Sequence, residues 1–338
     1  MGGLADFGVA AYGDPLEEAR HCRQHCALFD FSFMARGKLQ GPGALGCLQG
    51  FQSRDLGAMR QGQIRYSLLT DSAAAVVADL TVWKISSDRY DIYLGKREDM
   101  LTIKEHIPST AVFADLSENT RVFSLQGPAS LSVLSRLTDG RRLRSLEYFQ
   151  QDSFEVAGTH CQIGRLGYTG EKGFEIVVDN PVDGDKVWSM LAELAAPAGM
   201  IAADILRIEA GFILFLNECR AGCTARELGL GQFCLSGRGN PAYRLVCFTA
   251  TAAADALPWS SPRQIVRAPA PGEILVTSAS LSPLVDHVLG LGLVRWDHDD
   301  TLHLVDPKEK FRQIEVVNRP FYDPSKSLPR QQWVHDHH

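Results

Sequence analysis

The sequence contains no apolar run that approaches the ~20 residues a helix needs to cross a bilayer. Its longest apolar stretches, such as Ala73–Ala78 and Ile213–Leu216, are far shorter. The opening residues, 1–8, lack the basic and then apolar order of a secretory signal. We therefore expect a cytoplasmic protein that has no membrane partner.

An excess of positive charge is also missing. The chain has 34 Lys and Arg against 40 Asp and Glu, which gives a formal net charge of −6. Such a protein has no net field that attracts polyanions. Nucleic acid is therefore not an expected partner.

Common metal and dinucleotide motifs are absent as well. No glycine-marked βαβ spacing of a dinucleotide-binding fold is present. The eight cysteines are spread along the chain without an export signal, which favours reduced thiols. Two groups could still suggest a metal: His21 and Cys22 with His25 and Cys26, and Cys219 with Cys223. The usual ligand-spacing test disfavours both, so we predict no metal site.

The chain has 338 residues, of which 45% are hydrophobic, enough for two or three domains. Helix formers behind Asp14 and Pro15 predict a helix over 15–29. Residues 64–69, 76–85 and 90–94 alternate with a period of two and predict an antiparallel meander. These patterns together predict a mixed α+β fold.

The pattern changes after about residue 236. Short strand-like runs follow one another with few helical patterns between them, which is typical of a barrel or jelly roll. The runs are 243–249, 273–277, 290–295, 302–305 and 313–317. A small all-β domain is therefore expected at the C-terminal end.

The segment from Arg165 to Glu175 is the most informative motif. Three glycines frame Tyr168 and two carboxylates directly before an apolar strand. A glycine-rich turn with no further role is the alternative interpretation. Glu175, however, is the second residue of that strand, so its carboxylate points either to solvent or into a pocket where it must be paired.

This segment resembles the folate-site signature of the glycine-cleavage T-protein (aminomethyltransferase) family. Further motifs resemble that family in the same order and cover most of residues 20–325. They are Leu28–Met34, Tyr66–Leu69 with Ala78–Leu80, Leu206–Gly211, Thr224–Gly231 and Pro320–Pro324. The resemblance implies a three-domain cloverleaf, with two α+β subdomains in residues 1–222 and an all-β barrel in residues 240–325. Tetrahydrofolate would lie in the central channel.

Carried over residue by residue, the resemblance places Tyr66, Asp79, Tyr168, Glu175 and Arg207 at folate-contacting positions. Glu175 would hold the N–H edge of the pterin with two parallel hydrogen bonds. The two tyrosine rings would pack on flat faces of the folate. Arg207 would donate to a pterin oxygen or to the glutamate tail.

Asp79 is the candidate catalytic residue. It lies in an apolar strand, where an unpaired carboxylate is costly, and a buried carboxylate can manage a proton during one-carbon transfer. The alternative is a structural aspartate that caps a turn or pairs with a buried arginine.

Some positions depart from the family pattern. Phe33 stands where the family has histidine, and Ala78 where it has a second aspartate. The family's barrel also contributes an arginine to the channel, and residues 303–312 hold no clear counterpart, although Arg312 lies near. Because these positions concern the substrate side, the sequence supports folate binding better than a particular donor.

The leading hypothesis is a tetrahydrofolate-dependent aminomethyl or methyl transferase, or demethylase, that acts on a small methylated amine, thioether or ether. One alternative is the glycine-cleavage aminomethyltransferase, which would use a lipoyl carrier protein as partner. A further alternative is a non-catalytic folate-binding accessory protein, or a subunit of an amine oxidase with a separate oxidase partner.

Overall fold

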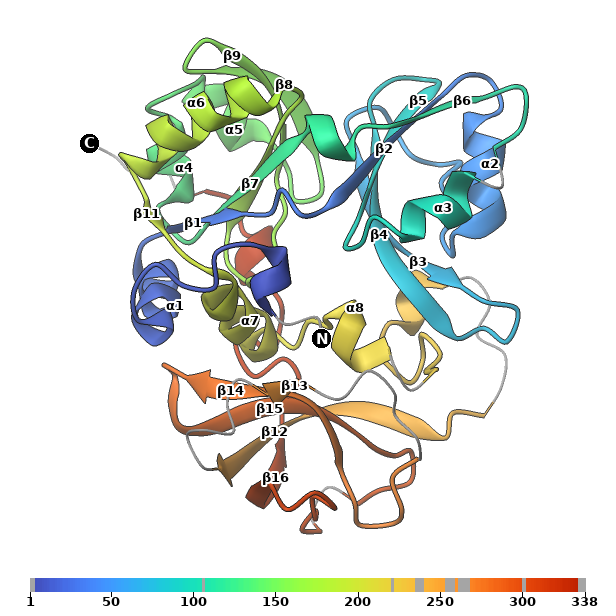
Figure 1. Ribbon diagram of the computed structural model, residues 1–338, viewed down its shortest axis with the longest axis vertical. Helices are drawn as coiled ribbons and strands as arrows, with labels where there is room; N and C mark the ends of the chain where they lie inside the picture. Colours follow the sequence, from blue (N-terminus) through green and yellow to red (C-terminus); the bar gives the residue numbers. More distant parts are fainter. Residues whose placement is uncertain are drawn as a thin grey trace.

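The computed structural model describes residues 4–104, 107–219, 222–234, 240–252, 259–260, 268–299 and 302–333. Helices and three β-sheets form three lobes, each built around one sheet (Figure 1). This is the α+β class that the sequence predicts. The proposed division at residues 222 and 240 stays a prediction, since 220–221 and 235–239 lie outside the described residues.

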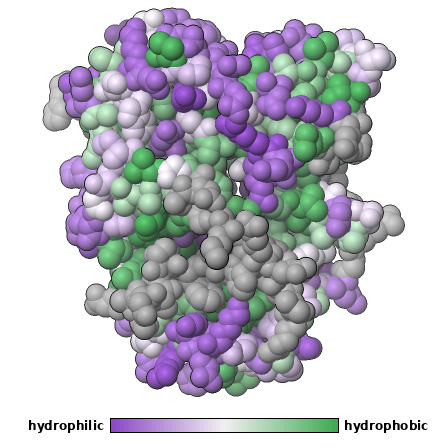
Figure 2. All heavy atoms as spheres, in the orientation of Figure 1, coloured by the Kyte–Doolittle hydropathy of each residue, from purple (hydrophilic) through white to green (hydrophobic). Residues whose placement is uncertain are grey.

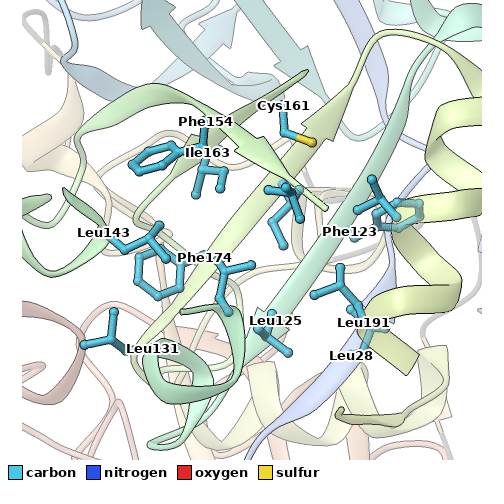
Figure 3. Close-up of a cluster of buried hydrophobic side chains, with 14 of the residues drawn as sticks. Leu28, Phe123, Leu125, Leu131, Leu143, Phe154, Cys161, Ile163, Phe174 and Leu191 are labelled. Carbon is cyan, nitrogen blue, oxygen red and sulfur yellow. The ribbon is translucent and has the colours of Figure 1, made fainter. Parts of the chain in front are cut away.

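Sheet I has six strands in the order β11-β1-β7-β10-β9-β8. The strands are β1 Ala27–Asp30, β7 Arg121–Gln126, β8 Gln151–Val156, β9 Thr159–Gly164, β10 Gly173–Val178 and β11 Ala196–Pro197. Its lobe also holds α4 Ser130–Leu134, α5 Gly140–Ser145 and α6 Pro181–Ala192. The helices and one face of the sheet enclose a core that contains Leu125, Phe154 and Phe174 (Figure 3). Every residue of β10 is buried, because the other face of the sheet is covered too.

Sheet II has five strands in the order β3-β4-β5-β2-β6. They are β2 Ala35–Gln40, β3 Ile64–Thr70, β4 Val76–Lys84, β5 Arg89–Leu94 and β6 Val112–Asp115, with helices α2 Ala44–Phe51 and α3 Asp99–Lys104. The chain leaves sheet I after β1 and returns to it at β7, so the lobe of sheet II is an insertion. Residues 31–34 cross from one sheet to the other.

Sheet III has five strands in the order β13-β14-β15-β12-β16. They are β12 Tyr243–Ala252, β13 Trp259–Ser260, β14 Leu275–Ser282, β15 Val285–Arg295 and β16 Phe311–Val317. Alternate residues of β12 face two different cores: Phe248 lies inside the sheet and Cys247 lies against the rest of the molecule. Isolated bridges join Leu304 to Ile314 of β16 and Val305 to Glu273, which lies just before β14. Within the described residues, β13 and β16 do not pair to close the sheet.

The remaining helices lie between the lobes. They are η1 Leu4–Phe7, α1 Pro15–Gln24, η2 Ser117–Asn119, α7 Met200–Glu209, α8 Phe215–Glu218, η4 Gly231–Phe233 and η6 Leu328–Arg330. Helix α7 is buried along almost its whole length, including Asp204, Arg207 and Glu209. Buried charges of this kind must be paired, and α7 therefore holds the lobes together through polar contacts.

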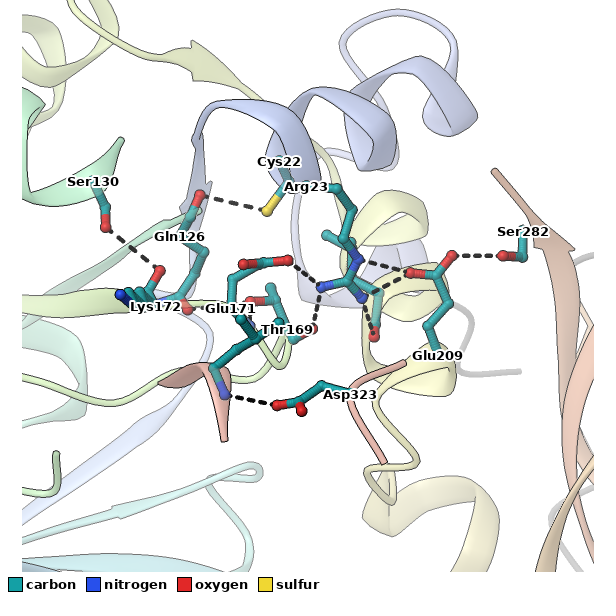
Figure 4. A network of polar contacts seen from close by, with 12 residues as sticks. Cys22, Arg23, Gln126, Ser130, Thr169, Glu171, Lys172, Glu209, Ser282 and Asp323 are labelled. Atoms are coloured by element: carbon teal, nitrogen blue, oxygen red, sulfur yellow. Dashed lines mark hydrogen bonds and ion pairs between the residues drawn. The ribbon is translucent and has the colours of Figure 1, made fainter. Parts of the chain in front are cut away.

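Arg23 of α1 is the centre of one such network (Figure 4). Its guanidinium contacts Glu209 of α7 at 2.7 Å and Glu171 of the glycine-rich segment at 3.0 Å. Glu209 in turn accepts a hydrogen bond of 2.6 Å from Ser282 of β14. The network fixes the loop before β10 relative to two other elements.

Two local predictions need correction. The helix predicted over 15–29 begins as expected, with Asp14 accepting a hydrogen bond from the Leu16 N–H at 2.8 Å, but it ends at Gln24. Residues 27–30 form β1, because the short apolar run pairs with β7 and β11, which local periodicity cannot reveal.

The strand predicted over 302–305 is the second correction, since this run forms only isolated bridges at Leu304 and Val305. The meander over 64–94 is confirmed.

On the face shown in Figure 2, hydrophilic and hydrophobic residues are interspersed over the two upper lobes. Among the described residues, none of the helices is both long and apolar enough to span a bilayer.

Candidate functional site

A cavity of about 800 Å³ lies where the three lobes meet. Its walls come from sheets I and II, from the segment that follows α7, and from residues 319–330. Pockets for small ligands and cofactors have volumes of roughly 300–1,000 Å³. The cavity is therefore large enough for a folate-sized molecule.

Tyr66 and Asp79 line this cavity from the adjacent strands β3 and β4. The Tyr66 hydroxyl donates to Asp79 Oδ2 at 3.0 Å. Burial raises the pKa of Asp79 to about 6, although the hydrogen bond from Tyr66 acts in the opposite direction. No arginine pairs with Asp79 in the described part of the chain, which argues against the structural alternative. The carboxylate is therefore held in place and can exchange a proton near neutral pH.

Glu175 lines the cavity from β10 and is only 8% exposed. Within the described residues, neither of its carboxylate oxygens accepts a hydrogen bond or pairs with a cation. Burial alone raises the pKa of Glu175 to about 7. Because a buried carboxylate without a partner is costly, this position calls for a ligand that donates hydrogen bonds.

Tyr168 forms part of the cavity wall. Its hydroxyl donates to the Ile213 carbonyl, and its ring stacks on Phe212 with the centroids 6.0 Å apart and the planes at 17°. The hydroxyl is thus already used within the protein, and the ring is fixed as a flat surface. An aromatic ligand can stack on such a surface.

Arg207 is not among the residues that line the cavity. Its fully buried guanidinium donates to Asp204 at 2.8 Å, Glu218 at 3.0 Å and the Ser278 hydroxyl at 2.6 Å. Burial lowers the pKa of Arg207, but the two carboxylates outweigh burial and raise it. The structure therefore brings Tyr66, Asp79, Tyr168 and Glu175 to one cavity and leaves Arg207 behind its wall.

Arg319 lines the cavity and was missed from the sequence. It donates to the carbonyls of Gly211 at 3.1 Å and Leu228 at 2.7 Å, and burial lowers its pKa to about 10. Arg312, the nearest sequence candidate for an arginine from the C-terminal region, is exposed on β16. The position of Arg319 directly before the Pro320–Pro324 motif is the signal that could have identified it.

The two positions that depart from the family pattern have different surroundings. Phe33 lines the cavity together with Phe7 and Phe31, and its ring centroid lies 4.9 Å from that of Phe7 and 5.8 Å from that of Phe31. Ala78 is buried in the core of the sheet II lobe instead. Only the Phe33 position therefore changes the wall of the cavity.

The four cysteines of the two groups that could suggest a metal are buried and free. The Cys22 thiol donates to the Gln126 carbonyl at 3.4 Å. Burial raises the pKa of the Cys22, Cys219 and Cys223 thiols. In the portion of the chain that the structure describes, no three His, Cys, Asp or Glu side chains come together as a metal site.

Comparison with known proteins agrees with this geometry. The GCVT N-terminal domain family matches residues 12–236. An aminomethyltransferase of Geobacillus thermodenitrificans is 31% identical over 92% of this chain and 91% of its own. One of Streptomyces avermitilis is 30% identical over 93% of this chain and 91% of its own.

A solved structure shares the fold. The glycine cleavage system aminomethyltransferase T of Bartonella henselae superposes with a TM-score of 0.69, at 22% identity and with 97% of each chain covered. The family match and the relatives that align over nearly the full length show that this chain belongs to the GCVT aminomethyltransferase family and is a tetrahydrofolate-dependent transferase.

Proposed function

We propose that this protein transfers an aminomethyl carbon from a lipoyl carrier protein to tetrahydrofolate. The observation that carries the proposal is the Glu175 carboxylate, which has no partner in the described part of the chain and lies in the same cavity as the Tyr66–Asp79 pair. Relatives named aminomethyltransferase that match this chain over nine-tenths of its length favour this donor over the small methylated compounds that the sequence ranked first.

The residues present fit tetrahydrofolate. The pterin offers adjacent N–H donors, and Glu175 has both oxygens available to accept them as a charge-assisted pair. The fixed ring of Tyr168 offers a stacking surface. Arg319, which pairs with no carboxylate among the described residues, takes the role of donor to a pterin oxygen or to the glutamate tail that the resemblance implies for Arg207.

Asp79 is the proposed catalytic residue. Tetrahydrofolate, when bound, supplies the amine nitrogen that receives the one-carbon unit. Asp79 is ionised above a pH of about 6, and Tyr66 holds one of its oxygens, so the other can accept and hold a proton in a fixed position. General acid–base groups of this kind typically contribute about 10²–10⁴-fold in rate.

A second donor class has one observation in its favour. The rings of Phe7, Phe31 and Phe33 give part of the cavity an apolar wall. Such a wall suits the methyl groups of a small amine, thioether or ether better than a polar group, which would be left without a hydrogen-bond partner there.

The experiment compares kcat/KM for the two donor classes at saturating tetrahydrofolate. Efficient turnover of an aminomethyl-loaded lipoyl carrier protein, with release of ammonia, supports the proposal. Turnover of free methylated donors alone would replace it with the second donor class. Absence of any turnover, with folate binding intact, would instead indicate an accessory protein.

A further inference from the structure

Three cationic side chains reach the cavity from one stretch of chain. Arg319, Lys326 and Arg330 all line it, and they lie in the segment that follows sheet III. Lys326 is half-buried and Arg330 is exposed at the edge. The nearness of Arg319 and Arg330, added to burial, lowers the pKa of Lys326.

These cations lack the carboxylate partners that three other arginines of this protein have. Arg23, Arg36 and Arg207 each contact a carboxylate at 3.0 Å or less. Within the described residues, Arg319, Lys326 and Arg330 form no ion pair, although carboxylates such as Asp79 and Glu175 line the same cavity. Like charges held together without counter-charge are unfavourable, so an anionic ligand group would relieve the repulsion.

The backbone presents Lys326 in a defined way. The Asp323 carboxylate accepts hydrogen bonds from the Ser325 and Ser327 hydroxyls and, at 2.7 Å, from the Leu328 N–H. Lys326 sits in this turn with φ of 52°, in the left-handed region that a residue with a Cβ rarely adopts. Strained positions of this kind persist where surrounding contacts hold them, and they cluster at ligand sites.

Lys326 is also placed beside the proposed stacking surface. Its Nζ lies 5.7 Å from the centroid of the Phe212 ring, which stacks on Tyr168. A ligand whose aromatic part packs on this wall would therefore bring a group attached to that part close to the ammonium.

We propose that Lys326, with Arg319 behind it and Arg330 at the edge, forms an anion subsite that binds the carboxylate-bearing tail of the folate. This inference rests on the proposed function, because it assigns the tail end of the same ligand. Lys326 then determines which reduced pterins bind well: those with a carboxylate tail, rather than those that end at the aromatic ring.

The experiment measures binding of two ligands by calorimetry: tetrahydrofolate, and the primary amide of tetrahydropteroate, which keeps the aromatic ring but ends in a neutral carboxamide in place of the glutamate tail. Lys326→Met should weaken tetrahydrofolate binding about tenfold or more, the range expected for one charge-assisted hydrogen bond. It should leave binding of the tetrahydropteroate amide unchanged, and Lys326→Arg should restore most of the loss. The matched control is Lys186→Met, which removes an exposed lysine of α6 and should change neither affinity.

Equal weakening of both ligands by Lys326→Met, or no weakening of either, would overturn the subsite while leaving the proposed function intact. Failure of the wild-type protein to bind either ligand would overturn the proposed function and the subsite with it. A thermal melt of each variant separates loss of binding from loss of fold.

Discussion

Tyr66 and Asp79 are diagonal neighbours on one face of the β3–β4 pair, and their side chains meet at 3.0 Å. Tyr66 lies opposite Thr81, and Asp79 lies opposite Leu68. Diagonal neighbours on adjacent strands are within reach of a long aromatic side chain. The sheet register therefore supplies the cavity with a carboxylate whose orientation is set by a phenol.

Replacing Asp79 by asparagine should remove most of the turnover. The amide keeps the size of the side chain but cannot accept a proton, so we expect kcat to fall by about 10²–10⁴-fold. Tetrahydrofolate affinity should stay within a few-fold. Single-turnover kinetics and calorimetry measure the two quantities, and near-normal turnover would leave Asp79 a structural residue.

Tyr66→Phe should move the pH dependence of kcat. The lost hydrogen bond normally lowers the pKa of Asp79, so without it that pKa rises above about 6. Because the proposed role of Asp79 requires its ionised form, the acidic limb of the profile should shift to higher pH. A profile that keeps its midpoint while kcat falls would show that Tyr66 acts on the ligand instead.

Folate binding should release protons near neutral pH. Glu175 has a pKa of about 7 in the free protein, and hydrogen bonds from a ligand would lower it. About half of the molecules carry this proton at pH 7, so binding should release roughly half a proton there. Calorimetry in buffers of different ionisation enthalpy measures the release. The Glu175→Gln variant should bind folate more weakly and should no longer release this proton. If the variant released as many protons as the wild type, the proton would belong to another group.

The same glutamate should lower stability at higher pH. Its pKa in the folded protein, about 7, lies above its ordinary value of 4.5. The folded state therefore binds more protons between these values, and the contribution of Glu175 to stability falls as pH rises from about 4.5 to 7. From pH 5 to pH 8, the free energy of unfolding of Glu175→Gln should rise relative to that of the wild type by on the order of 1–3 kcal/mol. Urea unfolding of both proteins measures this difference. A constant difference across this window would contradict the assignment.

Replacing Arg207 should mainly reduce the stability of the protein, whereas replacing Arg319 should mainly reduce its affinity for folate. Arg207→Met leaves Asp204 and Glu218 buried without their cation, which should cost roughly 3–5 kcal/mol. Arg319→Met loses hydrogen bonds to two carbonyls, a smaller cost of about 1–3 kcal/mol, but should weaken folate binding. Denaturant unfolding and ligand titration of both variants check this. The reverse order of effects would return the ligand contact to Arg207.

The sequence by itself determined the features that depend on local pattern. Alternation over 64–94 predicts the meander that carries Tyr66 and Asp79, and Asp14 with Pro15 predicts the start of α1. The apolar strand that contains Glu175 follows from its residues too. These features need only neighbouring residues, because strand and cap preferences act over a few positions.

Only the tertiary structure decided which of the charged residues line the cavity. Arg207 and Arg319 each lie in or beside a family-like motif. Arg207, however, donates to Glu218 and, in sheet III, to Ser278, whereas Arg319 donates to the carbonyls of Gly211 and Leu228. Likewise, residues 27–30 become a strand only because β7 and β11 pair with them. Such partners are distant in sequence, and the pairing of a buried charge depends on which groups the fold brings within about 3 Å of it.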